Sequence, residues 1–209
     1  MPGPALRRLG RPEGATGARV ARLDRDRSLV DAARADPARF EALYRKYVAQ
    51  VYNFAVYELR DHHEAEDATE RTFLNALANL PRFEERAGAE DGEDASTFRI
   101  WLFRIARNTI AERRRGRRRR PEARLEAAFG AADPTDIEGS AIVREEAAAA
   151  WRAIDRLPDD RRRAVVLRFV HEMTTEEIAG VLGRSEGAVR VLLHRALRSV
   201  ASDLGRDRR

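Results

Sequence analysis

The sequence predicts an all-α protein built from two small helical domains that a flexible linker joins. Apolar residues recur at helical spacing in two separate blocks, and a segment with proline, glycine and acidic residues but weak periodicity lies between them. The 209 residues, 43% of them hydrophobic, suffice for one large or two small cores. We expect a disordered arm, a first domain, a linker, a second domain and a tail at residues 1–30, 31–118, 119–141, 142–204 and 205–209.

Composition excludes several classes of protein. The chain has no cysteine, which excludes disulfides, a cysteine-type zinc site and a thiol switch. We find no apolar run long enough to cross a bilayer, and residues 1–27 lack the apolar segment of a secretory signal. We therefore expect a soluble, cytoplasmic protein without membrane insertion.

Arginine dominates the basic residues, and Lys46 is the single lysine. The forked guanidinium of arginine suits phosphates and base edges, which points to nucleic acid as a partner. The coding bias of a genome explains scattered arginines, but it does not explain a cluster.

The first domain is predicted to begin with a long helix. Residues 1–27 mix glycine, proline and arginine with no sustained apolar period, as is typical of a disordered arm. Asp36 can then cap a helix that has Pro37 at its first position. One apolar stripe follows, at Phe40, Leu43, Tyr44, Tyr47, Val51, Phe54 and Ala55.

A second helix should follow, because Asp61 and Glu64 have the spacing of a helix cap. Its apolar stripe consists of Ala65, Ala68, Phe73, Ala76, Leu77 and Leu80. The opposite side is acidic, with Glu64, Glu66, Asp67 and Glu70. From periodicity alone this is a solvated face.

The stretch FRIWLFRIARNTIAERRRGRRRR, residues 98–120, runs from apolar residues into seven arginines within eight positions. At 100° per residue, a helix here has a core face of Phe98, Trp101, Leu102, Ile105, Ala106 and Thr109. Elsewhere on the helix lie Ile100, Phe103, Arg104, Arg107 and Arg114. An exposed aromatic ring among arginines can stack on unpaired bases. The spacing equally allows Phe103 to pack under the preceding loop.

The second domain has clearer boundaries. Its first helix has an apolar face and stops at Pro158, with Val143, Ala147, Ala150, Trp151, Ile154 and Leu157 on that face. Asp159 or Asp160 can cap the next helix, which carries Val165, Val166, Phe169 and Val170. Thr174 and Glu177 then have capping-box spacing, Gly183 can end a short helix, and Ser185 can cap the last one.

The last helix is predicted to have a buried face and a basic face. Facing inward are Val189, Leu192, Leu193, Ala196, Leu197 and Val200, and facing outward are Arg190, Val191, His194, Arg195 and Arg198. A short helix, a tight turn and a helix with a basic face are the pattern of a helix-turn-helix, whose second helix enters the major groove. The alternative is an arginine-rich surface helix that binds nothing.

These blocks, in this order, resemble the extracytoplasmic-function group of bacterial sigma-70 factors, the promoter-recognition subunits of RNA polymerase. FEALYRKYVAQVYNFA, AEDATERTFLNAL and FRIWLFRIARN resemble sigma region 2. LPDDRRRAVVLRFV, EEIAGVLG and GAVRVLLHRA resemble sigma region 4. The resemblance covers about residues 36–200.

The resemblance implies roles for particular residues of the first domain. The acidic face of the second helix would dock on the coiled coil of the polymerase beta-prime subunit, through Glu66, Asp67 and Glu70. Minus-ten DNA would be melted and a flipped base held by Asn79, Phe83, Ile105 and Asn108, with help from the loop 82–97. To these the helical spacing adds Ile100, Phe103, Arg104 and Arg107. Arg71 departs from the family pattern, which commonly has an acidic residue there, and the loop 84–95 is unusually long and acidic.

In the second domain, the resemblance implies that region 4 reads the minus-thirty-five element as duplex and rests on the beta-subunit flap. The matching DNA contacts are Arg168, Arg190, Val191, His194 and Arg195. An anti-sigma factor is a further partner that the family implies. HEMTTEEIA and the pair Val191 and Leu192 depart from the usual family sequence, so the upstream promoter element cannot be predicted.

Two alternative functions remain open. An ordinary helix-turn-helix regulator would use the second domain, but this hypothesis assigns no function to residues 98–108. An RNA-binding protein would use the arginine run. An enzyme is least supported, because the four histidines lack metal-site spacing and there is no glycine-rich phosphate loop, so we expect no metal and no cofactor.

Overall fold

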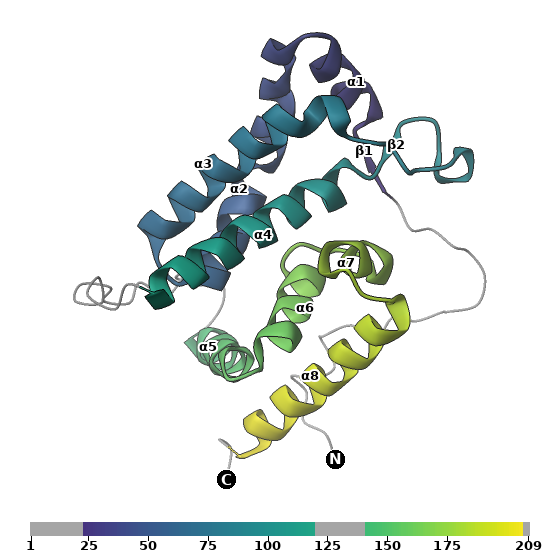
Figure 1. Ribbon diagram of the computed structural model, residues 1–209. Coiled ribbons are helices and arrows are strands. Elements are labelled where there is room, and N and C mark those ends of the chain that lie inside the picture. Colours follow the sequence, from purple (N-terminus) through teal and green to yellow (C-terminus); the bar gives the residue numbers. More distant parts are fainter. Residues whose placement is uncertain (1–22, 120–140, 207–209) are drawn as a thin grey trace.

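The computed structural model describes residues 23–119 and 141–206, which are mostly helical (Figure 1). The first domain contains α1 (Arg27–Ala35), α2 (Phe40–Leu59), α3 (His62–Asn79) and α4 (Phe98–Arg119). The second contains α5 (Ala141–Asp155), α6 (Asp159–Phe169), α7 (Thr175–Leu182) and α8 (Glu186–Arg206). The all-α prediction is confirmed. Nearly all of the predicted linker, and residues 1–22 of the predicted arm, lie outside the described residues.

The first ordered residues come earlier than predicted. Strand β1 (Asp24–Arg25) pairs antiparallel with β2 (Ala95–Ser96), and α1 begins at Arg27. Val30 and Ala33 of α1 are buried in the core. The prediction of a disordered arm through residue 30 is therefore wrong for residues 24–30, because Val30 and Ala33 are buried and Asp26 accepts from Lys46 and Tyr47 of α2.

Most predicted helix ends are confirmed. Asp36 caps a short 3-10 turn (Pro37–Arg39) that leads into α2, and Asp61 caps α3 by accepting from the Glu64 amide. Thr174 and Glu177 form the predicted capping box of α7. One prediction is wrong: α6 starts at Asp159 itself, after Pro158, so neither Asp159 nor Asp160 is its N-cap residue. At the other end, α8 continues to Arg206, two residues into the predicted tail.

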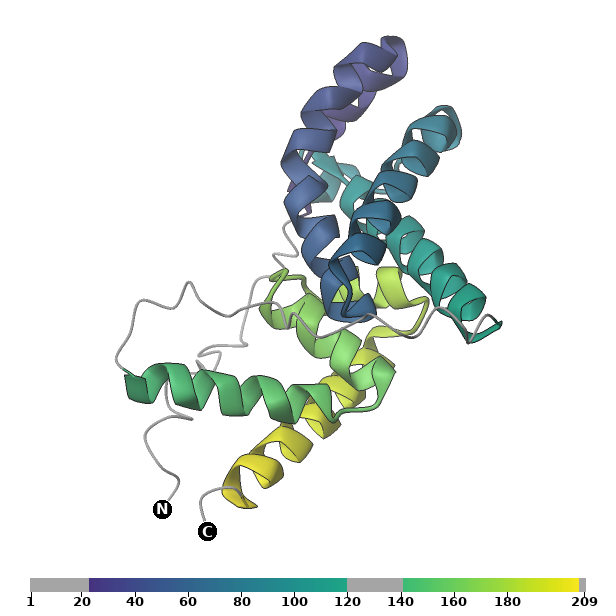
Figure 2. The same ribbon diagram turned by 90° about the vertical axis from the view of Figure 1, so that its left-hand side faces the viewer.

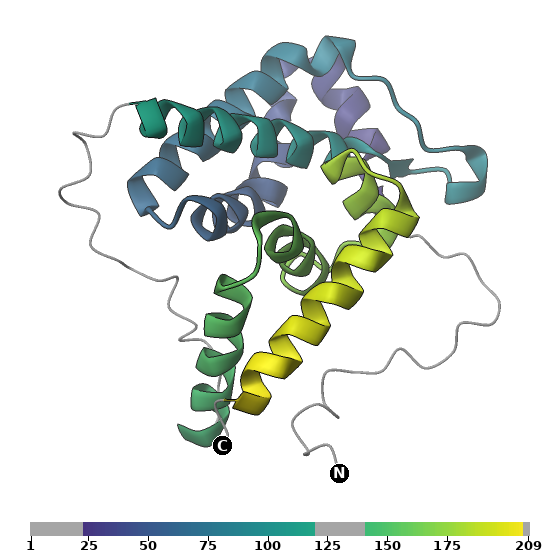
Figure 3. The same cartoon turned by 60° about the horizontal axis from the view of Figure 1, so that its bottom comes forward.

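Between α3 and α4 the chain makes 3-10 turns at Leu80–Arg82 and Ala89–Asp91 before it reaches β2. Seen from the side, α1 to α4 lie together above α5 to α8 (Figure 2). The two domains nevertheless share one hydrophobic core, which runs from Phe40 in α2 through Phe103 in α4 to Ile178 in α7. Figure 3 shows α7 against α4, while α8 starts beside α7 and extends away from α4. Within the described residues the domains are thus packed together.

Candidate nucleic-acid interface

The outer face of α8 is open to solvent. Arg190, Val191, His194 and Arg195 are all exposed, whereas Val189 and Ala196 on the other side are buried. This confirms the exposure that we predicted for this face; Leu197, predicted to face inward, is instead 43% exposed.

The turn before α8 gives this helix its direction. Gly183 follows α7 with φ of 65°, a left-handed conformation that favours glycine. The Ser185 hydroxyl then accepts a hydrogen bond from the Ala188 amide, at 3.3 Å, as predicted for a cap. Arg190 forms an exposed ion pair with Glu186 at 2.6 Å. Such pairs contribute little, so the guanidinium remains available for another partner.

Arg168 lies apart from the α8 residues, on the last turn of α6. It is exposed, but its guanidinium donates to the Met173 carbonyl at 2.9 Å and so supports the turn that leads into α7. The sequence did not indicate this structural contact. A DNA contact by Arg168 stays a prediction.

The predicted minus-ten residues fall into three groups by exposure. Asn79, Arg104 and Asn108 are exposed, and Ile100, Ile105 and Arg107 are partly buried. Phe83 and Phe103 are buried. The Phe83 ring packs between Phe98 and Trp101, with ring centroids 5.9 and 5.1 Å away, so it supports the core beneath the loop.

Phe103 corrects the sequence prediction most directly. It is 0% exposed, and its ring lies 5.5 Å from Phe54 and 5.2 Å from His171 of the second domain. It packs neither under the preceding loop nor into solvent, because the second domain covers this face of α4. Helical periodicity identifies a face but cannot show that another domain covers it.

The contact between α4 and α7 is close. A Cβ atom built on Gly180 would lie 2.6 Å from Cγ2 of Ile100, nearer than real side chains approach, so glycine permits the two helices to meet. Ile100 is one of the predicted minus-ten residues. In this arrangement α7 therefore covers part of the surface that the sequence assigned to DNA.

A buried arginine connects the domains beside this contact. Arg99 of α4 donates to the His171 carbonyl at 2.5 Å, and its Nη1 lies 3.6 Å from the Glu177 carboxylate. Burial, helped by the charge of Arg99, lowers the pKa of His171 to about 4. The imidazole is therefore neutral near pH 7 and packs against Phe103 without a charge to solvate.

A second ionic contact lies at the end of α2. Glu58 is 4% exposed and accepts from Nε and Nη2 of Arg163 in α6, at 3.0 and 2.7 Å. Arg114 of α4 reaches the same carboxylate at 3.3 Å. Nearby, the rings of Tyr57 and Trp151 stack with centroids 5.2 Å apart. The interface between the domains thus combines apolar, aromatic and charged contacts.

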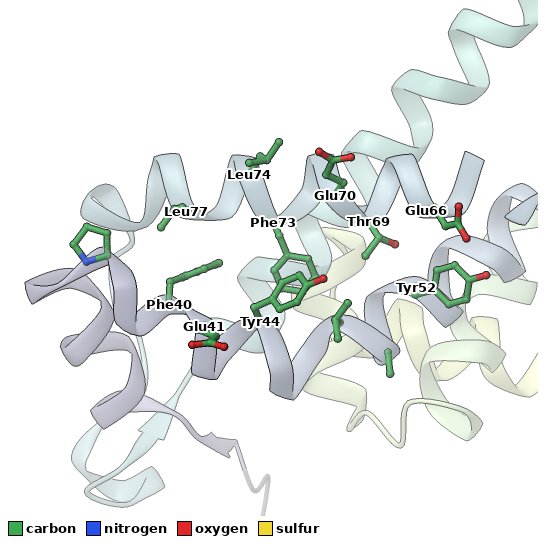
Figure 4. A pocket seen from close by; sticks show the side chains of 13 residues that line it. Phe40, Glu41, Tyr44, Tyr52, Glu66, Thr69, Glu70, Phe73, Leu74 and Leu77 are labelled. Carbon is green, nitrogen blue, oxygen red and sulfur yellow. The ribbon is translucent and has the colours of Figure 1, made fainter. Parts of the chain in front are cut away.

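An apolar groove of about 720 Å³ separates α2 from α3 on the first domain (Figure 4). Tyr44, Phe73, Leu74 and Leu77 line it, and Leu74 is 58% exposed. Leu77, which we predicted to be in the core, is 36% exposed and lines this groove.

The three acidic residues predicted to bind polymerase make different contacts in the structure. Glu66 and Glu70 line the apolar groove. Asp67 instead accepts from Arg113 of α4 at 3.0 Å, beside a 2.6 Å contact between Arg113 and Glu64. The structure therefore places two of the three at the groove and turns the third toward α4.

In the part of the chain that the structure describes, no group of histidine and acidic side chains is arranged to hold a metal ion. Among the same residues, no helix is both long and apolar enough to span a bilayer.

Comparisons with known proteins match both domains. Residues 43–120 match the family model Sigma-70 region 2, and residues 147–200 match Sigma-70, region 4. The RNA polymerase sigma-H factor of Pseudomonas aeruginosa is 32% identical over 187 residues, or 85% of this chain and 92% of that protein. The ECF RNA polymerase sigma factor SigL of Mycobacterium tuberculosis is 30% identical over 182 residues, or 83% and 95%.

Two further similarities extend this result. The ECF RNA polymerase sigma factor BldN of Streptomyces coelicolor is 34% identical over 187 residues; the match covers 87% of this chain and 66% of BldN. The solved structure of CnrH in complex with the cytosolic domain of CnrY has a TM-score of 0.62 at 25% identity, and covers 88% of this chain and 99% of that one.

The fold and its exposed surfaces define a two-domain protein of the sigma type, with a helical region 2 followed by a helix-turn-helix region 4. The matches over both domains make the assignment more specific. The chain belongs to the extracytoplasmic-function group of the sigma-70 family.

Proposed function

We propose that this chain binds core RNA polymerase and directs it to promoters, where it takes part in DNA melting and transcription initiation. The observation that carries the proposal is the presence of both sigma regions in one chain, in the order of the family. RNA synthesis belongs to the polymerase, so the chain has no enzymatic role of its own. It acts in the cytoplasm, together with polymerase and DNA.

The groove between α2 and α3 is the proposed docking site for the beta-prime coiled coil. An apolar groove with acidic residues on its rim suits an amphipathic helix that carries basic residues. Glu66 and Glu70 contact the partner, and the exposed Leu74 packs against it. Asp67 acts indirectly, because Arg113 already binds it.

The exposed face of α8 is the proposed reader of the minus-thirty-five element. Arg190 and Arg195 can reach guanine edges in the major groove, and Val191 can contact a thymine methyl. His194 lies on the same exposed face. Arg168, on α6, binds nearby phosphates, while region 4 also rests on the beta-subunit flap.

The exposed part of α4 is the proposed site for minus-ten DNA. Asn79, Arg104 and Asn108 are exposed, and Ile105 and Arg107 are partly exposed. Unstacking DNA costs about a few kcal/mol per base step, which the contacts to extruded bases must offset. Ile100 packs against Gly180 of α7 and Phe103 packs against His171, so both join this surface only after the second domain leaves α4. Promoter opening therefore requires the two domains to separate.

Reconstitution with core polymerase of the host tests the proposal. Core enzyme, with and without this chain, is given fragments of the host genome, and run-off transcripts are mapped. We expect starts at new positions only when the chain is present. Transcripts that are the same in both reactions would contradict the proposed function.

A second candidate, a conventional helix-turn-helix regulator, is favoured by one observation: α8 exposes its basic face even while the domains are packed together. The two functions differ in the binding of intact promoter DNA. A regulator binds its duplex site as a free chain, whereas a sigma subunit does so with polymerase. An anti-sigma partner stays a prediction.

A further inference from the structure

Residues 24–34, which we call the strap, lie against the acidic loop, residues 83–97. Strand β1 supplies the first contact, with Asp24 opposite Ser96 and Arg25 opposite Ala95. The strap precedes residues 43–120, which match the region 2 family model. The strap therefore lies outside the matched part of the chain, whereas the loop lies within it.

The strap is fixed to the core at Asp26. This carboxylate is 0% exposed and accepts from the Tyr47 hydroxyl and from Lys46, both on α2. The Tyr47 hydroxyl oxygen also lies 2.7 Å from the Asp24 carboxylate, so the two carboxylates share its one proton. Burial and the two neighbouring carboxylates raise the pKa of Tyr47, so the phenol stays protonated and remains a donor. The strap is thus a firm attachment point for the loop.

Arg27 connects this attachment point to both sides of the loop. Its Nη2 donates to the Ala87 carbonyl at 2.9 Å, and its Nε donates to the Ala95 carbonyl at 3.1 Å. The Arg27 amide also donates to the Asp94 carbonyl at 3.2 Å. A planar guanidinium fixes two acceptors at once in a way that a single ammonium cannot. Arg27 therefore sets the separation between the two arms of the loop.

Neighbouring contacts support the same geometry. The Ser28 amide donates to the Asp94 carboxylate at 2.9 Å, and Arg34 donates to the Phe83 carbonyl at 2.6 Å. Within the loop, Glu85 accepts from the Thr97 amide and hydroxyl, each at 2.8 Å. The acidic loop is closed at its base by Glu85 and held from outside by the strap.

We propose that Arg27 is a positioning residue for promoter selectivity: by bridging Ala87 and Ala95 it holds the acidic loop in the shape that discriminates the flipped minus-ten base. The inference rests on the proposed function and on the expectation, from the family resemblance, that this loop helps to hold the flipped base. Arg27 itself need not touch DNA. Its effect passes through the backbone of the loop.

Hydrogen exchange of the free, full-length chain tests the structural half of this inference. In Arg27→Ala we expect amides of residues 84–97 to exchange about tenfold faster, because two hydrogen bonds to the loop are lost. Arg25→Ala is the matched control, since the Arg25 side chain is exposed and makes no hydrogen bond to a described residue. Unchanged exchange in Arg27→Ala would overturn the inference without any use of polymerase.

Transcription by the reconstituted holoenzyme tests the functional half. Templates differ by one base at each minus-ten position, and the yield ratio between the preferred base and the next best is measured. We expect Arg27→Ala to lower this ratio about three- to tenfold at one position, with polymerase binding unchanged. Arg27→Lys, which can keep one of the two contacts, should restore part of the ratio, and Arg25→Ala should keep all of it.

The outcomes separate the two proposals. A looser loop with an unaltered base ratio would show that Arg27 is structural only and would overturn the positioning role. If holoenzyme with the wild-type chain starts no new transcripts, the proposed function fails, and with it the selectivity role; the exchange experiment still decides whether Arg27 holds the loop.

Discussion

At the scale of single residues, a few charged side chains connect the two domains at positions with little solvent exposure. Glu58 lies on α2, and its main partner, Arg163, lies on α6. A buried ion pair contributes little net stability, since desolvation cancels most of the attraction. Removal of Glu58 is costly, however, because Arg163, 16% exposed, keeps only a longer contact, 3.7 Å from the Asp160 carboxylate.

Glu58→Ala should therefore lower the free energy of unfolding by about 2 to 4 kcal/mol, as measured by urea denaturation. The matched control is Glu41→Ala, on the same helix, whose carboxylate meets Arg45 at 2.6 Å in solvent. That variant should lose about 0.5 kcal/mol or less. Equal losses in both variants would show that the Glu58 pair is not buried as described.

His171 makes the packed state sensitive to acid. The folded protein keeps it neutral down to its lowered pKa of about 4, whereas the unfolded chain takes up a proton below the ordinary value of 6.5. Between these two pKa values the unfolded state binds more protons than the folded state, so stability falls as the pH drops from 6.5 to 4. Below pH 4 the contribution of His171 to the free energy of unfolding stops changing.

The contribution lost over this range is at most about 3 kcal/mol. We expect the melting temperature of the wild-type chain to fall further between pH 6.5 and 4 than that of His171→Gln, which keeps a neutral side chain throughout. Nearby carboxylates, such as Glu177, titrate in the variant as well. Its curve therefore shows the pH dependence that does not come from His171. Parallel curves for the two proteins would contradict the neutral state of His171.

At the scale of elements, α4 shows how far sequence alone could lead. Phe98, Leu102 and Ala106 were predicted to be core and are buried, because one periodic stripe faces α2 and α3. The spacing left Phe103 either exposed or packed under the preceding loop; it is buried instead against Phe54 and His171, since α4 is packed on two sides. Two apolar residues three positions apart on the second side, Ile100 and Phe103, were the available signal.

Local chemistry made α7 and α8 the most predictable elements. Capping residues, a left-handed glycine and a periodic stripe all act within a few residues, so no distant contact was needed to place them. The strap and the groove depend on distant contacts instead. Arg27 meets a loop about sixty residues away in sequence, and the groove is lined by residues of both α2 and α3.

The exposed face of α8 leads to a prediction about promoter choice. Arg190→Ala and Arg195→Ala should each weaken holoenzyme binding to its upstream element by about 1 to 3 kcal/mol, if each removes one bidentate base contact. Arg198→Ala removes an exposed charge from the same helix, outside the proposed base contacts. Affinities for wild-type and scrambled upstream elements, measured at one salt concentration, should separate these variants. Equal loss on both elements would indicate phosphate contacts instead.

At the scale of the whole molecule, two surfaces that must work on DNA are not available together. The basic face of α8 is exposed, whereas Ile100 on α4 lies against Gly180 of α7 and Phe103 lies against His171, which precedes α7. One hydrophobic core extends through both domains. Opening a promoter by the proposed mechanism therefore requires this shared core to separate, which gives the account its central claim.

A reversible disulfide cross-link between α4 and α7 tests that claim most directly. A Cβ atom at Gly180 would lie 3.9 Å from the Ile100 Cβ, within the range for a disulfide, and the chain has no cysteine of its own. In the double variant Ile100→Cys with Gly180→Cys, promoter opening by the holoenzyme is followed by permanganate reaction of unpaired thymines. Ile100→Cys alone serves as the control, because a Cβ atom at residue 180 would lie 2.6 Å from Cγ2 of an intact Ile100.

We predict that the reduced double variant opens promoters as Ile100→Cys does, and that oxidation abolishes opening in the double variant alone. Promoter opening by the oxidised, cross-linked protein at the reduced level would contradict the requirement for the domains to part.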